Sequence, residues 1–253
     1  MTRRRAALLV RSAGLAGLVV LLEVLCRMGA IDALTIIPPS EMAAAMAEQL
    51  ASGDVLASVR QTFLTVALAL VLAVTLGTLG GALLHATPRL RRVLDPLLAS
   101  YYSVPTFIFY PFLVALLGLS MAPLVALGVM SAAPAMVIST LAGLDGVPRV
   151  LFKAARVQRL GRVRTLWLVV LPAAMPRLFS GLKLAMSYAL IGVIAGEFIL
   201  SGSGLGYAIS YAYQSFDNRA MYGLMLFVLL AAVSVNGLLY AWEGTLARRR
   251  AGG

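Results

Sequence analysis

Long apolar runs separated by short polar segments dominate the chain. The run from Gln61 to Pro88 contains no acidic residue, lysine or arginine, and neither does the run from Pro96 to Leu144. A helix needs about 20 apolar residues to cross a bilayer. The first run therefore predicts one span, and the second predicts two that are joined by a turn at Gly118 to Pro123. Apolar runs from Ala174 to Leu200 and from Ala220 to Trp242 predict two further spans.

The amino-terminal apolar run follows a basic segment and extends from about Ala6 to Leu25. A secretory signal peptide has the same order of segments, and Met28 to Ala30 resembles a cleavage site. Glu23 is unusual in the apolar part of a signal peptide, so we favour an uncleaved first span. The chain is then expected to have six spans, at about residues 6–27, 60–86, 99–119, 122–143, 175–200 and 220–243.

One long polar connection, from Ile31 to Ser58, separates the first two predicted spans. Its Pro38-Pro39-Ser40 sequence predicts an extended turn followed by a helix start, with Ser40 as the N-cap. Glu41 to Leu50 then predicts a short amphipathic helix at the membrane face.

The most basic stretch of the chain, Leu151 to Pro176, lies between two apolar runs. Leu160, Val163, Leu166 and Trp167 recur at three- and four-residue steps, which predicts a helix with one apolar side. Two interpretations are open: a loop that only sets the membrane topology, or a docking helix for a soluble partner. The basic residues of this stretch are Lys153, Arg156, Arg159, Arg162 and Arg164.

Composition supports an integral membrane protein. The 253 residues are 61% hydrophobic and 12% charged, with a mean hydropathy of +0.93, whereas soluble domains have about 25% charged residues. The net charge of +11 does not indicate nucleic-acid binding, because the basic residues lie between apolar runs. A single cysteine, Cys26, allows no internal disulfide, and a single histidine, His85, argues against a zinc or haem site.

The basic residues also predict the topology. With six spans and both termini in the cytoplasm, 18 of the 21 lysines and arginines lie on the inside, and the other three are Arg27, Arg60 and Arg219. This bias follows the positive-inside rule. Lys183 is counted inside because its long side chain is expected to extend to the cytoplasmic interface.

Several motifs resemble those of a known family. Lys153-Ala154-Ala155, followed by Leu171-Pro172, is similar to the EAA loop of the membrane subunits of bacterial ABC importers. Gly196-Glu197-Phe198 and Gly204-Leu205-Gly206-Tyr207 resemble the nitrate, sulfonate and taurine branch of that family. The resemblance extends over about residues 60–245 and is most specific over 151–207.

The resemblance implies an all-α polytopic fold, that of a type I ABC importer permease. Residues 1–253 would form one transmembrane domain with a core at about 60–245 and a cytoplasmic coupling loop at about 148–174. Such a subunit is not an enzyme and binds no cofactor, since ATP and Mg²⁺ bind to partner ATPase subunits. The other implied partners are a second permease copy, a periplasmic or lipid-anchored binding protein and the lipids of the bacterial inner membrane, but no nucleic acid.

In the family, the loop forms a coupling helix in a groove of the ATPase. This sequence departs from the family pattern at two positions: Lys153 stands where glutamate is usual, and Arg159 stands where glycine is usual. Glycine allows a turn there because it tolerates positive φ, so either the turn shifts to Gly161 or the loop has another shape. The implied coupling residues are Lys153, Ala154, Ala155, Arg156, Arg159, Leu160, Gly161, Leu166, Trp167, Leu171 and Pro172.

Candidate residues for a translocation pathway lie near the middle and outer parts of the predicted spans. Tyr101 and Tyr102 belong to a pathway wall or to an interfacial aromatic belt. Met186 and Tyr188 line the pathway or serve in packing, and the intramembrane acid Glu197 has a gating or a structural role. The full set is Tyr101, Tyr102, Pro105, Phe107, Met186, Tyr188 and Glu197.

Further residues predict a contact on the outer face. Glycines between the fifth and sixth predicted spans suit a tight external loop. This loop and the tyrosines after it are candidates for contact with a binding protein: Gly204, Gly206, Tyr207 and Tyr211.

Two other classes of function fit the sequence less well than a permease subunit. A self-contained secondary transporter driven by an ion gradient commonly contains two matching halves, and no clear internal repeat is present. A membrane enzyme needs clustered nucleophiles, bases or metal ligands, which this sequence does not supply. Neither lysine follows a glycine, so the chain has no phosphate-binding GK[ST] loop. Nitrate, alkanesulfonates, taurine and pyrimidine-type vitamin precursors all remain open as substrates.

Overall fold

The computed structural model describes residues 2–32 and 35–251, and all regular elements within them are helical, which confirms the predicted all-α class. The elements follow one another in this order: α1 (Thr2–Arg27), α2 (Pro39–Ser52), α3 (Leu56–Ala86), α4 (Pro88–Ser100), η1 (Tyr101–Ser103), η2 (Thr106–Phe109), α5 (Tyr110–Leu117), α6 (Met121–Asp145), α7 (Arg149–Val157), α8 (Arg162–Thr165), η3 (Leu166–Val170), α9 (Leu171–Leu200), α10 (Leu205–Gln214) and α11 (Asn218–Ala251).

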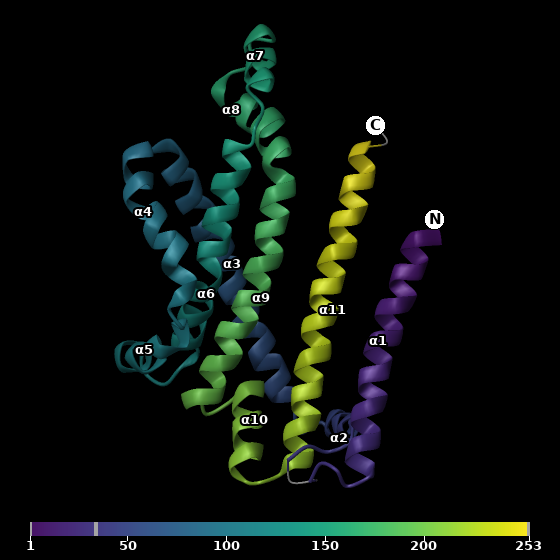
Figure 1. Cartoon of the computed structure of the whole chain (residues 1–253). Helices are drawn as coiled ribbons and strands as arrows, with labels where there is room; N and C mark the ends of the chain where they lie inside the picture. The colour runs from purple at the N-terminus through teal and green to yellow at the C-terminus, as the bar shows by residue number, and fades with distance from the viewer. Residues whose placement is uncertain (1, 33–34, 252–253) are drawn as a thin grey trace.

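Helices α3, α6 and α9 form the central bundle (Figure 1). Their contact surfaces consist largely of small side chains. A Cβ added at Gly128 of α6 would lie 2.7 Å from Ala69 Cβ of α3 and 2.9 Å from Val193 Cγ2 of α9. Helices in lipid associate through such close packing, because no hydrophobic force drives them together. The buried residues of this core are Val66, Ala69, Ala73, Ala132, Ala185, Met186, Ala189, Leu190 and Val193.

Four helical segments of the described chain are long and apolar enough to cross a bilayer: Leu56–Ala86, Met121–Asp145, Arg162–Leu200 and Asn218–Gly244. The predicted spans at 60–86, 122–143, 175–200 and 220–243 lie inside these four segments. The first predicted span coincides with α1, a helix of 26 residues. The total of six spans stays a prediction.

The third predicted span, 99–119, is not a straight helix. The segments Pro88–Ser103 and Thr106–Leu117 meet at an angle of 93°. Val104 is extended at the break, and Pro105, which has no backbone N–H, precedes the second segment. The basic residues after the second predicted span, Arg89, Arg91 and Arg92, lie on α4.

Polar contacts attach α11 to α9 at the edge of the bundle. Lys183 Nζ lies 2.5 Å from Glu243 Oε2 and 4.0 Å from the centroid of the Tyr240 ring. Ser187 Oγ donates to Asn236 Oδ1 at 3.3 Å. Glu243 lies at the end of the apolar segment of α11, so the ammonium group of Lys183 pairs with an acid there. Its extension to the membrane interface stays a prediction.

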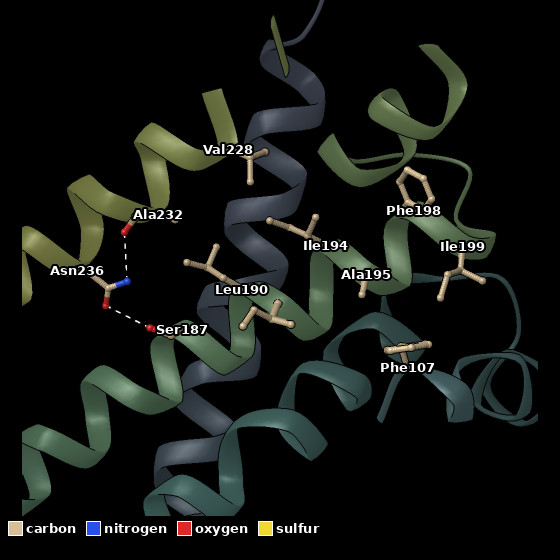
Figure 2. Close-up of a pocket in the computed structure, with 11 residues that line it drawn as sticks. Phe107, Ser187, Leu190, Ile194, Ala195, Phe198, Ile199, Val228, Ala232 and Asn236 are labelled. Carbon is tan, nitrogen blue, oxygen red and sulfur yellow. Dashed lines mark hydrogen bonds between the residues drawn. The ribbon is translucent and has the colours of Figure 1, made fainter. Parts of the chain in front are cut away.

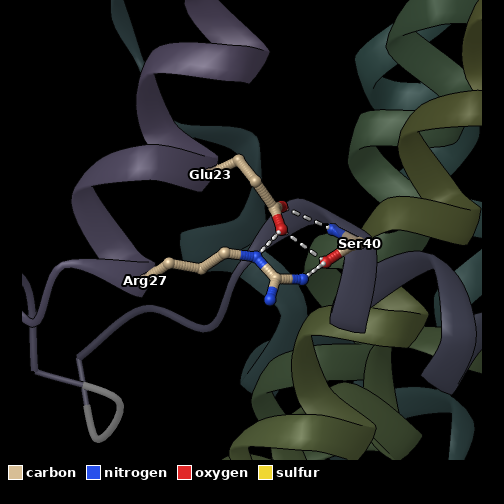
Figure 3. A network of polar contacts seen from close by, with 3 residues as sticks. All are labelled: Glu23, Arg27 and Ser40. Carbon is tan, nitrogen blue, oxygen red and sulfur yellow. Dashed lines mark hydrogen bonds and ion pairs between the residues drawn. The ribbon is translucent and has the colours of Figure 1, made fainter.

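Hydrogen bonds join the start of α2 to α1 (Figure 3). α2 begins at Pro39, so Ser40 is its second residue and not the predicted N-cap. The Ser40 amide donates to Glu23 Oε2 at 3.0 Å, and its hydroxyl donates to Glu23 Oε1 at 2.7 Å. Arg27 pairs with the same carboxylate. The first amides of a helix have no partner within it, so the carboxylate of α1 supplies the cap that Pro38 cannot.

The two ends of the molecule carry different elements (Figure 1). α7 and α8 project at one end, α11 ends on the same side, and α1 begins nearer the middle of the molecule. The short helices α2, α5 and α10 lie at the opposite end. Both terminal helices therefore direct their chain ends to the side of the basic loop.

Candidate functional site

The basic stretch folds into two short helices, α7 and α8, and continues through the π-helical turn η3 into α9. The single helix expected from the apolar spacing is therefore divided by a turn. Leu160, expected on one ridge with Val163 and Leu166, lies in this turn and is partly buried, whereas the other two side chains are exposed. Sequence spacing did not reveal the division, because the apolar residues keep a helical step across it.

The turn after α7 is a Schellman motif. The Leu160 N–H donates to Ala155 O at 2.9 Å, and the Arg159 N–H donates to Arg156 O at 3.0 Å. Arg159 has a φ of +51°, in the left-handed region, whereas Gly161 has a φ of −67°. The turn thus stays at Arg159, and the alternative that it shifts to Gly161 is wrong. The two hydrogen bonds that close α7 require the left-handed residue at this position.

Arg159→Gly is expected to stabilise the loop by about 1 kcal/mol, because glycine adopts a positive φ without the steric cost that a Cβ brings. Slower amide hydrogen exchange at residues 155–161 of the purified protein would report this gain. Gly161→Ala is the control, since its φ is ordinary and no atom lies within 4 Å of the added Cβ. Unchanged or faster exchange in the Arg159 variant would contradict the claim that the positive φ of Arg159 strains the turn.

The loop presents a basic and apolar surface to solvent. Its five basic side chains, Lys153, Arg156, Arg159, Arg162 and Arg164, are exposed, and within the described part of the chain no salt bridge pairs them with an acid. Val157 is 84% exposed and Trp167 is 63% exposed. Ala155 is buried beneath this surface, Ala154, Gly161 and Pro172 are exposed, and Leu171 is partly buried. The structure therefore brings most of the predicted coupling residues to one free end of the molecule.

An ion-pair cluster lies at the base of this loop. Asp145, the last residue of α6, accepts from His85 Nδ1 at 2.9 Å and from Arg91 Nη1 at 2.8 Å. Arg177 of α9 donates to the carbonyl of Ala142. The cluster joins α3, α4, α6 and α9 where the loop leaves the bundle. The sequence analysis did not predict this cluster, although Asp145, an acid that ends an apolar run beside basic segments, is a visible signal.

The three predicted pathway tyrosines contact one another. The rings of Tyr102 and Tyr188 stack with centroids 4.7 Å apart, and Tyr101 contacts Tyr102 edge-on at 5.8 Å. The Tyr101 hydroxyl donates to Met130 O at 2.8 Å. Tyr102 and the neighbouring Pro105 remain exposed. The aromatic residues thus form a surface shared by η1 and α9, which are far apart in the sequence.

The other predicted pathway residues lie in different surroundings. Met186 is buried in the core cluster, which favours its alternative role in packing. Phe107 lines an apolar cavity of about 550 Å³ between α9, α11 and η2 (Figure 2). Ser187 and Asn236 form the polar end of this cavity. Glu197 is 0% exposed, and its carboxylate points to α3 and α10 rather than to a cavity.

At the opposite end, the four candidate contact residues divide into two groups. Tyr207 and Tyr211 are exposed on α10, with ring centroids 6.2 Å apart. Gly204 and Gly206 are buried against Glu197. The glycines therefore support the tyrosine surface and do not belong to it. A polar cavity of about 300 Å³ lies beside them, lined in part by Gln61, Tyr110, Ser120, Ser201 and Ser203.

No group of three or more metal-ligating side chains occurs in the parts of the chain that the structure describes. The candidate site consists of three surfaces: the basic and apolar loop, the aromatic wall of Tyr101, Tyr102 and Tyr188, and the outer face of Tyr207 and Tyr211. A continuous helix, α9, connects the first of them to the third.

Comparison with known proteins assigns this arrangement to a family. The profile described as "Binding-protein-dependent transport system inner membrane component" matches residues 69–252. The chain belongs to this family. It is a membrane-spanning permease subunit of ABC importers and not an enzyme, because the ATPase of these systems is a separate chain.

Individual relatives agree with the family. An ABC transporter permease protein of Haemophilus influenzae is 32% identical over 71% of this permease and 71% of its own length. The taurine transport system permease protein TauC of Escherichia coli is 28% identical over 70% and 67% of the two chains. A chain of the inward-facing MetNI methionine ABC transporter superposes with a TM-score of 0.62 at 21% identity, covering 76% of this permease and 94% of that chain. The last match confirms the predicted type I fold.

Proposed function

We propose that this permease imports a small organic solute or oxyanion, that it works as a pair of identical subunits, and that the loop at 148–174 receives the force of ATP hydrolysis. The observation that carries the proposal is the exposed surface of α7 and α8, where basic side chains have no acidic partner within the described chain. Such a surface fits a groove that offers both acids and apolar contacts. ATP and Mg²⁺ bind to the ATPase that provides this groove, and the permease itself binds no cofactor.

In this proposal, the loop faces the cytoplasm of a bacterial cell whose inner membrane holds the protein. The bias of basic residues supports this orientation. The start of α1 and the end of α11 both point toward the loop side of the molecule, as expected for an even number of spans (Figure 1). A binding protein then approaches the opposite end, where Tyr207 and Tyr211 are exposed on α10. This protein is either periplasmic or lipid-anchored.

The translocation pathway in this proposal runs along the aromatic wall. Tyr102 and Pro105 are exposed, and an aromatic surface open to one side requires another element to close it. A second permease copy would close it, and membrane lipid would cover the outer apolar faces. Glu197 does not contact the solute, because it is fully buried.

The substrate class rests on the relatives. TauC is named for taurine transport, and the Gly196 to Tyr207 motifs resemble the nitrate, sulfonate and taurine branch. The aromatic wall carries no charged side chain, so it offers no fixed charge that would trap an anion or repel one. Selectivity among small solutes therefore resides mainly in the binding protein.

Reconstitution tests this function against that of a secondary transporter. The permease is inserted into proteoliposomes with the ATPase and the secreted binding protein encoded by neighbouring genes, and taurine, an alkanesulfonate and nitrate are offered separately. Uptake of at least one solute is expected only with ATP and the binding protein present. Uptake by the permease alone under an ion gradient would contradict the proposal.

A further inference from the structure

The carboxylate of Glu197 is fully buried near the outer end of α9, at 0% exposure. Its two oxygens each lie 2.8 Å from Thr62 Oγ1 of α3, and the Gly206 N–H of α10 donates to Oε2 at 3.0 Å. Buried acids are costly unless hydrogen bonds satisfy them. Here the bonds come from two other helices, so Glu197 joins three elements at one point.

Thr62 completes the connection. Its hydroxyl oxygen accepts from the Leu205 N–H at 2.8 Å while its hydrogen is directed to the carboxylate. Leu205 and Gly206 are the first two residues of α10, whose amides have no partner inside the helix. A carboxylate is favoured at this positive end of the helix dipole. Glu197 and Thr62 together therefore cap α10 from outside it.

The backbone of α10 is shaped for this carboxylate. Gly204 has a φ of +100°, and a Cβ at this position would overlap the Glu197 carboxyl group. A Cβ on Gly206 would lie 2.7 Å from Glu197 Cβ and 2.8 Å from the Phe198 backbone nitrogen. The Gly204-Leu205-Gly206 motif is thus required for close approach of α10 to α9.

The other end of α9 leads directly into the basic loop through η3. Between its ends, α9 packs closely on α6: a Cβ added at Gly196 would lie 2.9 Å from both Leu124 Cδ2 and Leu127 Cδ2. Helix α9 is continuous over its 30 residues, with Pro176 near its loop end. It is therefore the element that connects the outer end of the molecule to the basic loop.

We propose that Glu197 and Thr62 are positioning residues that fix α10 to α9, so that docking of the binding protein on α10 is transmitted along α9 to the ATPase loop. This proposal rests on the proposed function, because it assigns a role to the outer tyrosine face of α10. Neither residue contacts the solute. Their role is to keep the docking helix and the transmitting helix in one mechanical unit.

Thr62→Val tests the connection, because valine preserves the shape but removes both hydrogen bonds. In the purified full-length permease, hydrogen exchange at the amides of 205–209 is expected to rise about tenfold, the effect of losing one bond to a charged group. The matched control is Thr65→Val on the same helix, since the buried Thr65 hydroxyl bonds only to its own Gln61 carbonyl. Glu197→Gln is expected to raise the same exchange, and Thr62→Ser to restore it.

The functional measurement uses the complex of permease, ATPase and binding protein in nanodiscs. Thr62→Val is expected to leave the basal ATPase rate unchanged. The binding-protein concentration that gives half-maximal stimulation of the ATPase is expected to rise about tenfold. Normal stimulation in Thr62→Val, together with faster exchange in α10, would overturn the transmission role and leave the proposed function intact. A wild-type complex without stimulation would overturn both.

Discussion

Changing Lys153 and Arg156 to glutamate is expected to abolish ATP-driven uptake or reduce it at least about tenfold, since unfavourable charges across an interface cost several kcal/mol. Both side chains are exposed on α7 and carry positive charge toward the proposed groove. The variant permease should remain in the membrane and lose the ATPase on purification. Its uptake in proteoliposomes and the amount of co-purified ATPase measure the effect.

Arg89→Glu with Arg92→Glu provides the matched control. These two exposed residues of α4 belong to the same predicted cytoplasmic side but lie outside the loop, and the change in net charge is identical. Uptake within the normal range is expected for this pair. Equal losses in both double variants would show that total charge or topology matters, and not the loop.

Gly81→Ala is expected to destabilise the folded permease by about 1–3 kcal/mol, the usual cost of overpacking. The added Cβ would lie 2.7 Å from Thr140 Cβ and 2.8 Å from the Val137 carbonyl oxygen on α6. Because α3 and α6 form the centre of the bundle, the contact cannot be relieved by a flexible side chain. Thermal unfolding in detergent should therefore show a lower midpoint.

The neighbouring residue gives the comparison for this prediction. At Gly80, an added Cβ would lie 3.6 Å from Val137 Cγ2, an ordinary contact. Gly80→Ala should be neutral or stabilising, because alanine favours a helix over glycine by about 1 kcal/mol. A similar loss in both variants would mean that the two glycines serve flexibility, and would contradict the close packing of α3 on α6.

The apolar runs were sufficient to predict the four long spans, because length and hydropathy alone determine whether a helix crosses a bilayer. The break at Pro105 was also visible, since proline removes a backbone donor. The 93° bend was not, because it depends on where α5 finds its packing partner on α6. Arg159 shows the same limit: its left-handed conformation follows from two hydrogen bonds that close α7 and not from its own preference.

The connections at the two ends of α9 depend on residues far apart in the chain. Glu197 and Thr62 are 135 positions apart, and His85 and Asp145 are 60 apart. Periodicity within a helix cannot reveal such pairs. The motif Gly204-Leu205-Gly206 is visible in the sequence, where its glycines predict a tight external loop. In the structure they admit a carboxylate to the start of α10.

Site-specific photo-crosslinking in the assembled complex tests most directly the claim that the loop at 148–174 contacts the ATPase. The crosslinking residue replaces Val157 on the loop or Leu119 at the opposite end, and both positions are 84% exposed. We predict adducts with the ATPase from position 157 and none from position 119. Adducts from position 119, or none from position 157 in a complex that still transports, would contradict the account.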